Sequence, residues 1–298
     1  MKFLNRTIRW LETGMEIEGD EKHSQILVKE WCLENAKECT TPGVKASKPD
    51  EKAGENEIVP MTPEEATKFR RGVARIVYLA QDRVDMAFCS KELAKKMARP
   101  SVGDEGALKR AIRYLKSKPR ALYEYPWQEP PRALEVYTDS DWAGDVESRK
   151  STSGGVVMAG NHLITHWSRT QATIALSSGE AELNTSVKGA SEGLGLRQLA
   201  KELGSKLELH LLGDSSAAKG MMLRTGAGAI KHLCTKQLWI QERVSRREMV
   251  PRKIPRAINL ADSCTHHLGL QETGPLFRSA GLAWRESGCV LSEGGVQT

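Results

Sequence analysis

EVYTDSDWAGD, residues 135–145, is the stretch of sequence that decides the fold. Its first residues favour a β-strand, and the strand runs directly into two carboxylates, Asp139 and Asp141. Acids at the tip of a strand need an explanation, because a carboxylate drawn into a sheet must find a partner for its charge. The stretch therefore predicts a strand whose end attracts something positive.

The residues after this strand predict an α/β domain. Two more strands, at 154–160 and 162–168, meet at Gly160-Asn161 as a hairpin. A long helix at 179–203 follows, and then a strand at 207–214, helices at 215–223 and 231–245, a short strand at 247–255 and a last helix at 258–268. This alternation of strands and helices is typical of an α/β domain, which we assign to residues 131–270.

The residues before it predict a separate helical segment at 61–130. Thr62, Pro63 and Glu65 form a capping-box start for a helix at 62–81, and two further helices are expected at 84–98 and 104–117. Residues 1–60 contain a strand, a helix at 24–36 and a linker at 41–60, and we do not expect them to form a complete domain. Residues 271–298 are rich in Gly and Ser and predict a flexible tail.

Composition narrows the classes of protein to which this chain can belong. The 298 residues carry a net charge of +6, with 39% hydrophobic and 28% charged residues, as in ordinary globular proteins. No apolar run is long enough for a membrane span, and no secretory signal opens the chain, so we expect an intracellular protein without a membrane partner. The six cysteines form no CxxC pair, which favours reduced thiols.

Four acids fall where strand ends and helix starts converge on one edge of the sheet: Asp139, Glu182, Asp214 and Asp262. Each alone has an ordinary explanation as a helix cap, a helix-dipole partner or a turn residue. The long helix separates two candidates, because Glu182 shares a face with small and apolar residues whereas Glu180 shares the polar face. Several acids at one sheet edge would repel each other, and a divalent cation with a preference for oxygen ligands, such as Mg²⁺, would remove that cost.

The motifs together resemble the ribonuclease H domain of copia-type retrotransposon Pol polyproteins. The similar stretches are YTDSDWAGDVESRKSTSGGVVMAG, ITHWSRTQATIALSSGEAE, LLGDSSAAKG, KHLCTKQLWIQERV and INLADSCTHHL. Residues 61–130 resemble the thumb and connection of the reverse transcriptase in such elements, and residues 1–60 resemble a remnant of that enzyme. The resemblance is to the C-terminal part of the polyprotein, and no YxDD-type polymerase motif is present in the sequence.

This resemblance implies a ribonuclease H-like fold, a five-stranded mixed sheet with flanking helices, and an enzyme that hydrolyses the RNA strand of RNA–DNA hybrids. It implies two Mg²⁺ ions, with Mn²⁺ as a substitute, held by Asp139, Glu182, Asp214 and Asp262 in the role of catalytic and metal-binding residues. The partners would be the hybrid and the remainder of a reverse transcriptase polyprotein, in a cytoplasmic particle or the nucleus. The alternative is a decayed or co-opted element that binds nucleic acid without cutting it, since KHLC and DSSAA depart from the family's usual motifs.

A basic run at 243–256 is the other candidate binding feature. It holds six basic residues against Glu248 alone, which is typical of a surface that meets a polyanion, although a solvated face explains a lone basic run as well. The residues that we expect to contact nucleic acid are Lys231, Lys236, Arg246, Arg247, Arg252 and Lys253.

Overall fold

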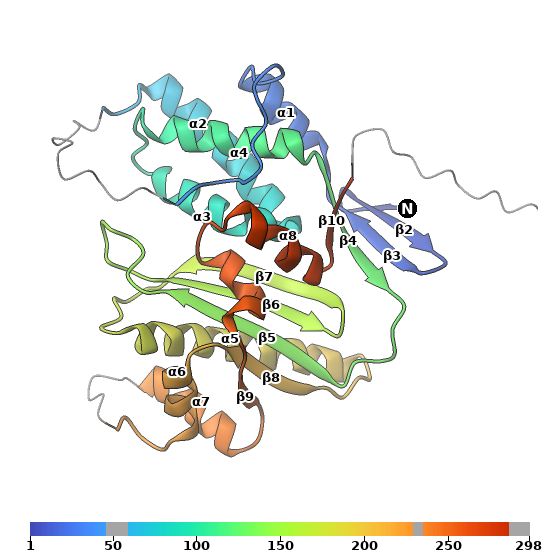
Figure 1. The fold of residues 1–298 in the computed structure, drawn as a ribbon, viewed down its shortest axis with the longest axis vertical. Coiled ribbons are helices and arrows are strands. Elements are labelled where there is room, and N and C mark those ends of the chain that lie inside the picture. The colour runs from blue at the N-terminus through green and yellow to red at the C-terminus, as the bar shows by residue number, and fades with distance from the viewer. Residues whose placement is uncertain (46–58, 229–234, 286–298) are drawn as a thin grey trace, which may run out of the picture.

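The computed structural model describes residues 1–45, 59–228 and 235–285. Figure 1 shows two sheets and a group of helices, with the strands of the larger, central sheet running across the middle of the molecule. In the described part of the chain, no helix is both long and apolar enough to cross a membrane.

The central sheet confirms the expected five-stranded mixed arrangement. Its strands are β5 (Ala133–Asp141), β6 (Thr152–Ala159), β7 (His162–Thr170), β8 (Glu208–Gly213) and β9 (Val250–Lys253), in the order β7-β6-β5-β8-β9. The first three are antiparallel, and β8 and β9 add in parallel. The β6–β7 turn is the expected one, and Gly160 takes the positive φ of 61° that this hairpin requires.

Helix α5 (Ser178–Glu202) lies against one face of this sheet (Figure 1). Its glycines permit a close approach: a Cβ on Gly189 would lie 2.5 Å from Thr138, and one on Gly193 would lie 2.6 Å from Leu209. Helices α6 (Ser216–Leu223) and α7 (Thr235–Ser245) pack beside α5. Because Thr138 faces α5, the next residue, Asp139, faces the opposite side of the sheet.

On that opposite side the 3₁₀ turn η4 (Leu260–Cys264), which follows a shorter turn η3 (Arg256–Ile258), packs against β5 and β6. The sequence predicted one helix over 258–268, and this prediction is wrong. Asn259 caps the start of η4, because its side chain accepts from the backbone N–H of Ala261 and donates to the carbonyl of Thr138, and the helical turn ends at Cys264. The turn η4 sits directly on β6, where a Cβ on Gly154 would collide with Thr265.

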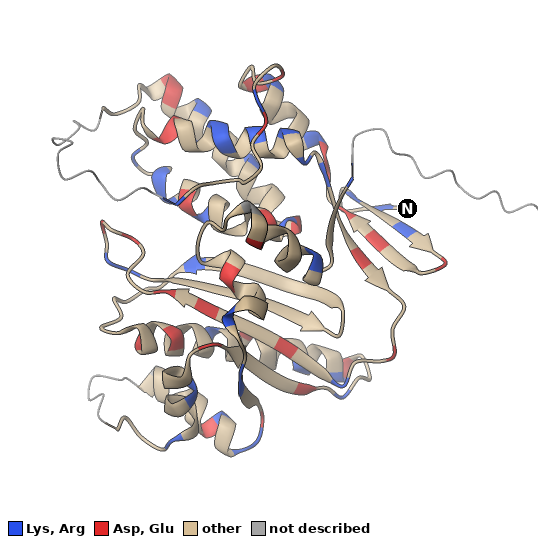
Figure 2. Cartoon of the chain, in the orientation of Figure 1, with Lys and Arg blue, Asp and Glu red and all other residues tan. Residues whose placement is uncertain are grey.

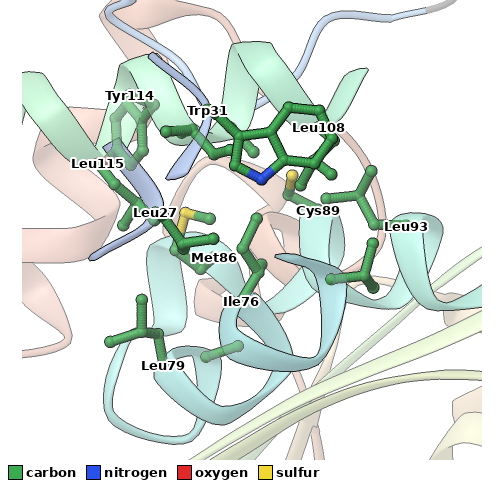
Figure 3. Packing of buried hydrophobic residues seen from close by; sticks show 14 of the residues in the cluster. Leu27, Trp31, Ile76, Leu79, Met86, Cys89, Leu93, Leu108, Tyr114 and Leu115 are labelled. Carbon is green, nitrogen blue, oxygen red and sulfur yellow. The ribbon is translucent and has the colours of Figure 1, made fainter. Parts of the chain in front are cut away.

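The three helices expected between residues 62 and 117 are present, and they share one core with residues of the N-terminal segment. Helices α2 (Pro63–Leu79), α3 (Ala87–Lys96) and α4 (Asp104–Ser117) pack with α1 (Lys22–Glu30), and two 3₁₀ turns, η1 (Ala80–Asp82) and η2 (Val84–Met86), join α2 to α3. The capping box of Thr62 and Glu65 is present. Figure 3 shows the side chains that fill this core, among them Trp31, Ile76 and Leu108.

A second sheet joins the two ends of the chain and corrects two expectations. It has the order β1-β2-β3-β4-β10, from β1 (Lys2–Phe3), β2 (Arg6–Leu11), β3 (Gly14–Glu18), β4 (Arg120–Pro126) and β10 (Leu282–Arg285). The expected single strand at the N-terminus is therefore a hairpin. Residues 270–285 are not a flexible tail, because α8 (Leu270–Ser279) and β10 are ordered elements and Phe277 and Leu282 are buried. The rest of the predicted tail, 286–298, and most of the predicted linker, 46–58, lie outside the described residues.

Candidate active site

Three of the four predicted acids meet at the end of β5. Ligand oxygens of Asp139, Glu182 and Asp214 all lie within 4.8 Å of one another. Asp139 comes from β5, Glu182 from the first turns of α5, and Asp214 directly follows β8. Strand ends and a helix start thus converge on one edge of the sheet, as the sequence predicted.

The fourth acid, Asp262, lies on the other side of Asp139. Ligand atoms of Asp139, Asp262 and His266 also lie within 4.8 Å of one another. Asp139 therefore belongs to both groups, and we call the four acids together the carboxylate cluster. His266 was missed by the sequence reasoning, although its position four residues after Asp262 could have drawn attention to it.

Hydrogen bonds fix the cluster to the sheet. The backbone N–H of Ser140 donates to Glu182 at 3.3 Å, and the Thr265 hydroxyl donates to Asp139 in a short bond. Thr138 between them is held twice: its hydroxyl donates to the carbonyl of Leu212 at 3.1 Å, and its own carbonyl accepts from Asn259 at 3.1 Å. These contacts connect β5, β8, α5 and η4 near Thr138, and they hold Asp139 and Glu182 in position.

Burial and mutual repulsion give the cluster an unusual electrostatic state. Burial, together with the charges of Asp139 and Asp214, raises the pKa of Glu182 from 4.5 to about 8. Burial also raises the pKa of Asp139 to about 6, against the hydrogen bond from Thr265, which lowers it. Both acids thus hold a proton more tightly than a free carboxyl does, because burial disfavours their ionised forms and the neighbouring acids add to the effect.

Asp141 lies outside both groups of potential ligands and links β5 to the helical segment. Its carboxylate accepts from the backbone N–H and the hydroxyl of Thr152, and the same hydroxyl accepts from Lys91 Nζ of α3 at 2.7 Å. A second bridge, from Lys95 of α3 to Asp145 at 3.0 Å, holds the loop that follows β5. Helix α3 therefore braces the end of the strand that carries Asp139.

Glu180 corrects the sequence argument about the long helix. It is only 5% exposed, although its helical face was predicted to be polar and solvated. Helix α7 covers the first part of that face, where Gln237 Nε2 lies 3.5 Å from Glu180 and 2.8 Å from Asn184. Farther along the same face Ser191, Gln198 and Glu202 are exposed, so the prediction holds only beyond the reach of α7.

The described residues among those predicted to bind nucleic acid lie on α7, on β9 and on the turn between them. Arg246 pairs with Glu242 at 2.6 Å, Arg247 is exposed, and Arg252 lies 3.2 Å from His210. Lys253 donates to Ser216 at 2.6 Å, two residues beyond Asp214. Figure 2 shows acidic residues on the central sheet and basic residues toward α7 and β9. Lys231 lies outside the described residues, and of Lys236 only the backbone position in α7 is described.

The solved structures that this chain resembles include ribonucleases H. LC11-RNase H1, isolated from compost, is 16% identical with a TM-score of 0.33, and the match covers 45% of this chain and 93% of that one. RNase H1 from the archaeon Halobacterium salinarum is 17% identical with a TM-score of 0.30, covering 45% and 94%.

No family model matches the sequence, but curated relatives do. The chain is 34% identical over 141 residues to the retrovirus-related Pol polyprotein from transposon RE2 of Arabidopsis thaliana, covering 47% of this chain and 10% of the relative. It is 30% identical over 205 residues to that of transposon RE1, covering 69% and 13%. It is 27% identical over 255 residues to that of transposon TNT 1-94 of Nicotiana tabacum, covering 83% and 19%. The chain spans less than a fifth of the length of these relatives, and the matches support a fragment of a retrotransposon Pol polyprotein.

Proposed function

We propose that this chain is the ribonuclease H-bearing part of a copia-type Pol polyprotein and hydrolyses the RNA strand of RNA–DNA hybrids. The observation that carries the proposal is the position of Asp139, which belongs to two groups of potential ligands at once. A shared carboxylate between two such groups is the arrangement that a pair of divalent cations requires.

The residues present fit such cations. The cluster offers carboxylate oxygens, the ligands that Mg²⁺ and Mn²⁺ accept, and the raised pKa values of Glu182 and Asp139 show that positive charge would be stabilising there. Cations bound there would activate water and stabilise the charge that develops on the leaving oxygen. The chain itself would hold Asp139 through Thr265 and Glu182 through Ser140, and these hydrogen bonds would keep the carboxylate oxygens in place.

The substrate proposal combines the cluster with the basic surface on α7 and β9. A hybrid duplex is a dense polyanion, and exposed Arg247, Arg252 and Lys253 would neutralise its phosphates while the cluster meets the strand that is cut. Phosphate contacts of this kind position a duplex without reading its sequence. We therefore expect cleavage with little base preference.

The test is cleavage of a labelled RNA–DNA hybrid by the full chain with Mg²⁺ or Mn²⁺, compared with Asp139→Asn. Glu147→Gln, an exposed acid in the loop after β5, is the matched control. We expect cleavage of the RNA strand that Asp139→Asn reduces by orders of magnitude and Glu147→Gln preserves. A wild-type chain that binds the hybrid but stays inert with either cation would favour the alternative of a decayed or co-opted element.

A further inference from the structure

The second ligand group contains a nitrogen. His266 Nε2 lies 3.4 Å from Asp262 Oδ2, and the histidine side chain is 20% exposed. Arg256 lies beside both residues, with Nη2 3.2 Å from Asp262 Oδ1 and 3.4 Å from His266 Nε2. The group therefore combines two carboxylates and an imidazole, and the guanidinium of Arg256 lies beside two of these three side chains.

The hydrogen bonds around His266 determine which ring nitrogen carries the proton. Thr265 donates its hydroxyl proton to Asp139, so its oxygen is left to accept, and His266 Nδ1 lies 3.1 Å from it. This places the proton on Nδ1 and leaves a lone pair on Nε2, next to the carboxylate of Asp262. A metal-binding histidine is commonly oriented in this way, by a hydrogen bond from the nitrogen that does not bind.

We propose that Asp139, Asp262 and His266 form a mixed oxygen and nitrogen site that prefers a first-row transition ion such as Mn²⁺ to Mg²⁺. The inference rests on the proposed function and refines it, because it concerns only one of the two cation positions. Mg²⁺ favours oxygen ligands, whereas an imidazole nitrogen is a good ligand for transition ions. The group of Asp139, Glu182 and Asp214 has oxygen ligands alone and gains no such preference.

The position of Arg256 also supports a cation site at Asp262 and His266. Its guanidinium group interacts with both Asp262 and His266, the two residues that a cation would join. Its side chain is 65% exposed, so it can move into solvent at little cost when a cation takes its place. Arg256 is thus a competitor for the site, and its removal should tighten cation binding.

The experiment measures Mn²⁺ binding to the full chain by electron paramagnetic resonance, with Mg²⁺ as a competitor. In the wild type we expect nitrogen coupling to the bound Mn²⁺ and displacement by Mg²⁺ only at a large excess. His266→Ala should abolish the coupling and weaken Mn²⁺ binding at this site by about tenfold or more. His266→Gln should behave in the same way while keeping a polar side chain, and Arg256→Gln should tighten binding.

His162 is the matched control, because it lies at the far end of β6 and β7 and bonds to the carbonyl of Pro126. His162→Ala should keep both the nitrogen coupling and the affinity. No nitrogen coupling in the wild type, or unchanged Mn²⁺ affinity in both His266 variants, would overturn the inference. Asp139→Asn separates this failure from failure of the proposed function: if it too leaves Mn²⁺ binding unchanged, the cluster is no cation site at all.

Discussion

Glu180 and Glu182 lie two residues apart in α5, and their carboxylates serve different parts of the molecule. Glu180 accepts from the backbone N–H of Leu176 at 2.8 Å and so closes the loop before the helix. Glu182 accepts from Ser140 on β5 and joins the carboxylate cluster. One acid therefore has a structural task and the other stands in the candidate active site.

Substitution with glutamine should separate the two tasks. Glu180→Gln weakens a buried hydrogen bond to a charged group, so we expect a loss of about 1 kcal/mol in unfolding free energy with the stabilisation by Mg²⁺ retained. Glu182, with its raised pKa, must take up a proton when the metal-free protein folds near pH 7. Glu182→Gln removes that cost, so the metal-free protein should become more stable and the stabilisation by Mg²⁺ should shrink. Chemical denaturation with and without Mg²⁺ checks both, and equal losses of the Mg²⁺ effect would contradict the assignment.

The metal-free protein should lose stability as the pH rises. The folded-state pKa of Glu182 is about 8 and that of Asp139 is about 6, both above their ordinary values of 4.5 and 3.8. The folded state therefore holds more protons than the unfolded state, and the unfolding free energy falls between about pH 4 and about pH 8. The total change should be on the order of 8 kcal/mol, since the two pKa shifts together amount to between five and six units and one unit corresponds to about 1.4 kcal/mol.

Denaturation with a chelator at several pH values measures this decline, and Asp139→Asn should flatten it. A divalent cation favours the ionised acids, so its binding near pH 7 should release protons. Calorimetry in buffers with different ionisation enthalpies detects that release. A flat stability profile in the wild type would show that the acids titrate normally.

Binding of an RNA–DNA hybrid should depend steeply on salt. Each phosphate contact contributes about one unit to the slope of log affinity against log salt. Neutral substitutions at Arg246 and Arg247 should therefore flatten the slope, with Lys109→Gln in α4 as the control on the helical segment. Arg246 already pairs with Glu242, so Arg247 should account for more of the change. An unchanged slope would make the basic run a solvated face.

The parts of this fold that sequence predicts are those set by local pattern. Strand β5, the β6–β7 hairpin and helix α5 follow from alternation, turn residues and caps, and the four acids follow from where those elements end. The second sheet could not be found in this way, because β10 has four residues and pairs with β4 from more than 150 positions earlier. The burial of Glu180 depends on α7, and a helical-wheel argument treats each helix alone.

The contact between Lys91 and Thr152 predicts that the helical segment takes part in placing the cluster. Lys91→Met keeps much of the side chain's apolar length but removes the donor to Thr152, whose hydroxyl and N–H hold Asp141 two residues from Asp139. The end of β5 should then hold Asp139 less firmly. If the chain cleaves hybrids as proposed, kcat should fall severalfold while KM stays near its wild-type value, because the basic surface is untouched.

Lys96→Met, at an exposed position of the same helix, is the matched control and should leave kcat unchanged. A variant that was only less stable would lose activity in proportion to its unfolded fraction, so the rates are compared well below the melting temperature, where both variants stay folded. Weaker stabilisation by Mg²⁺ in Lys91→Met provides a readout that needs no cleavage. Equal kinetics and equal Mg²⁺ effects in the two variants would mean that α3 merely packs against β6 and does not brace Asp139.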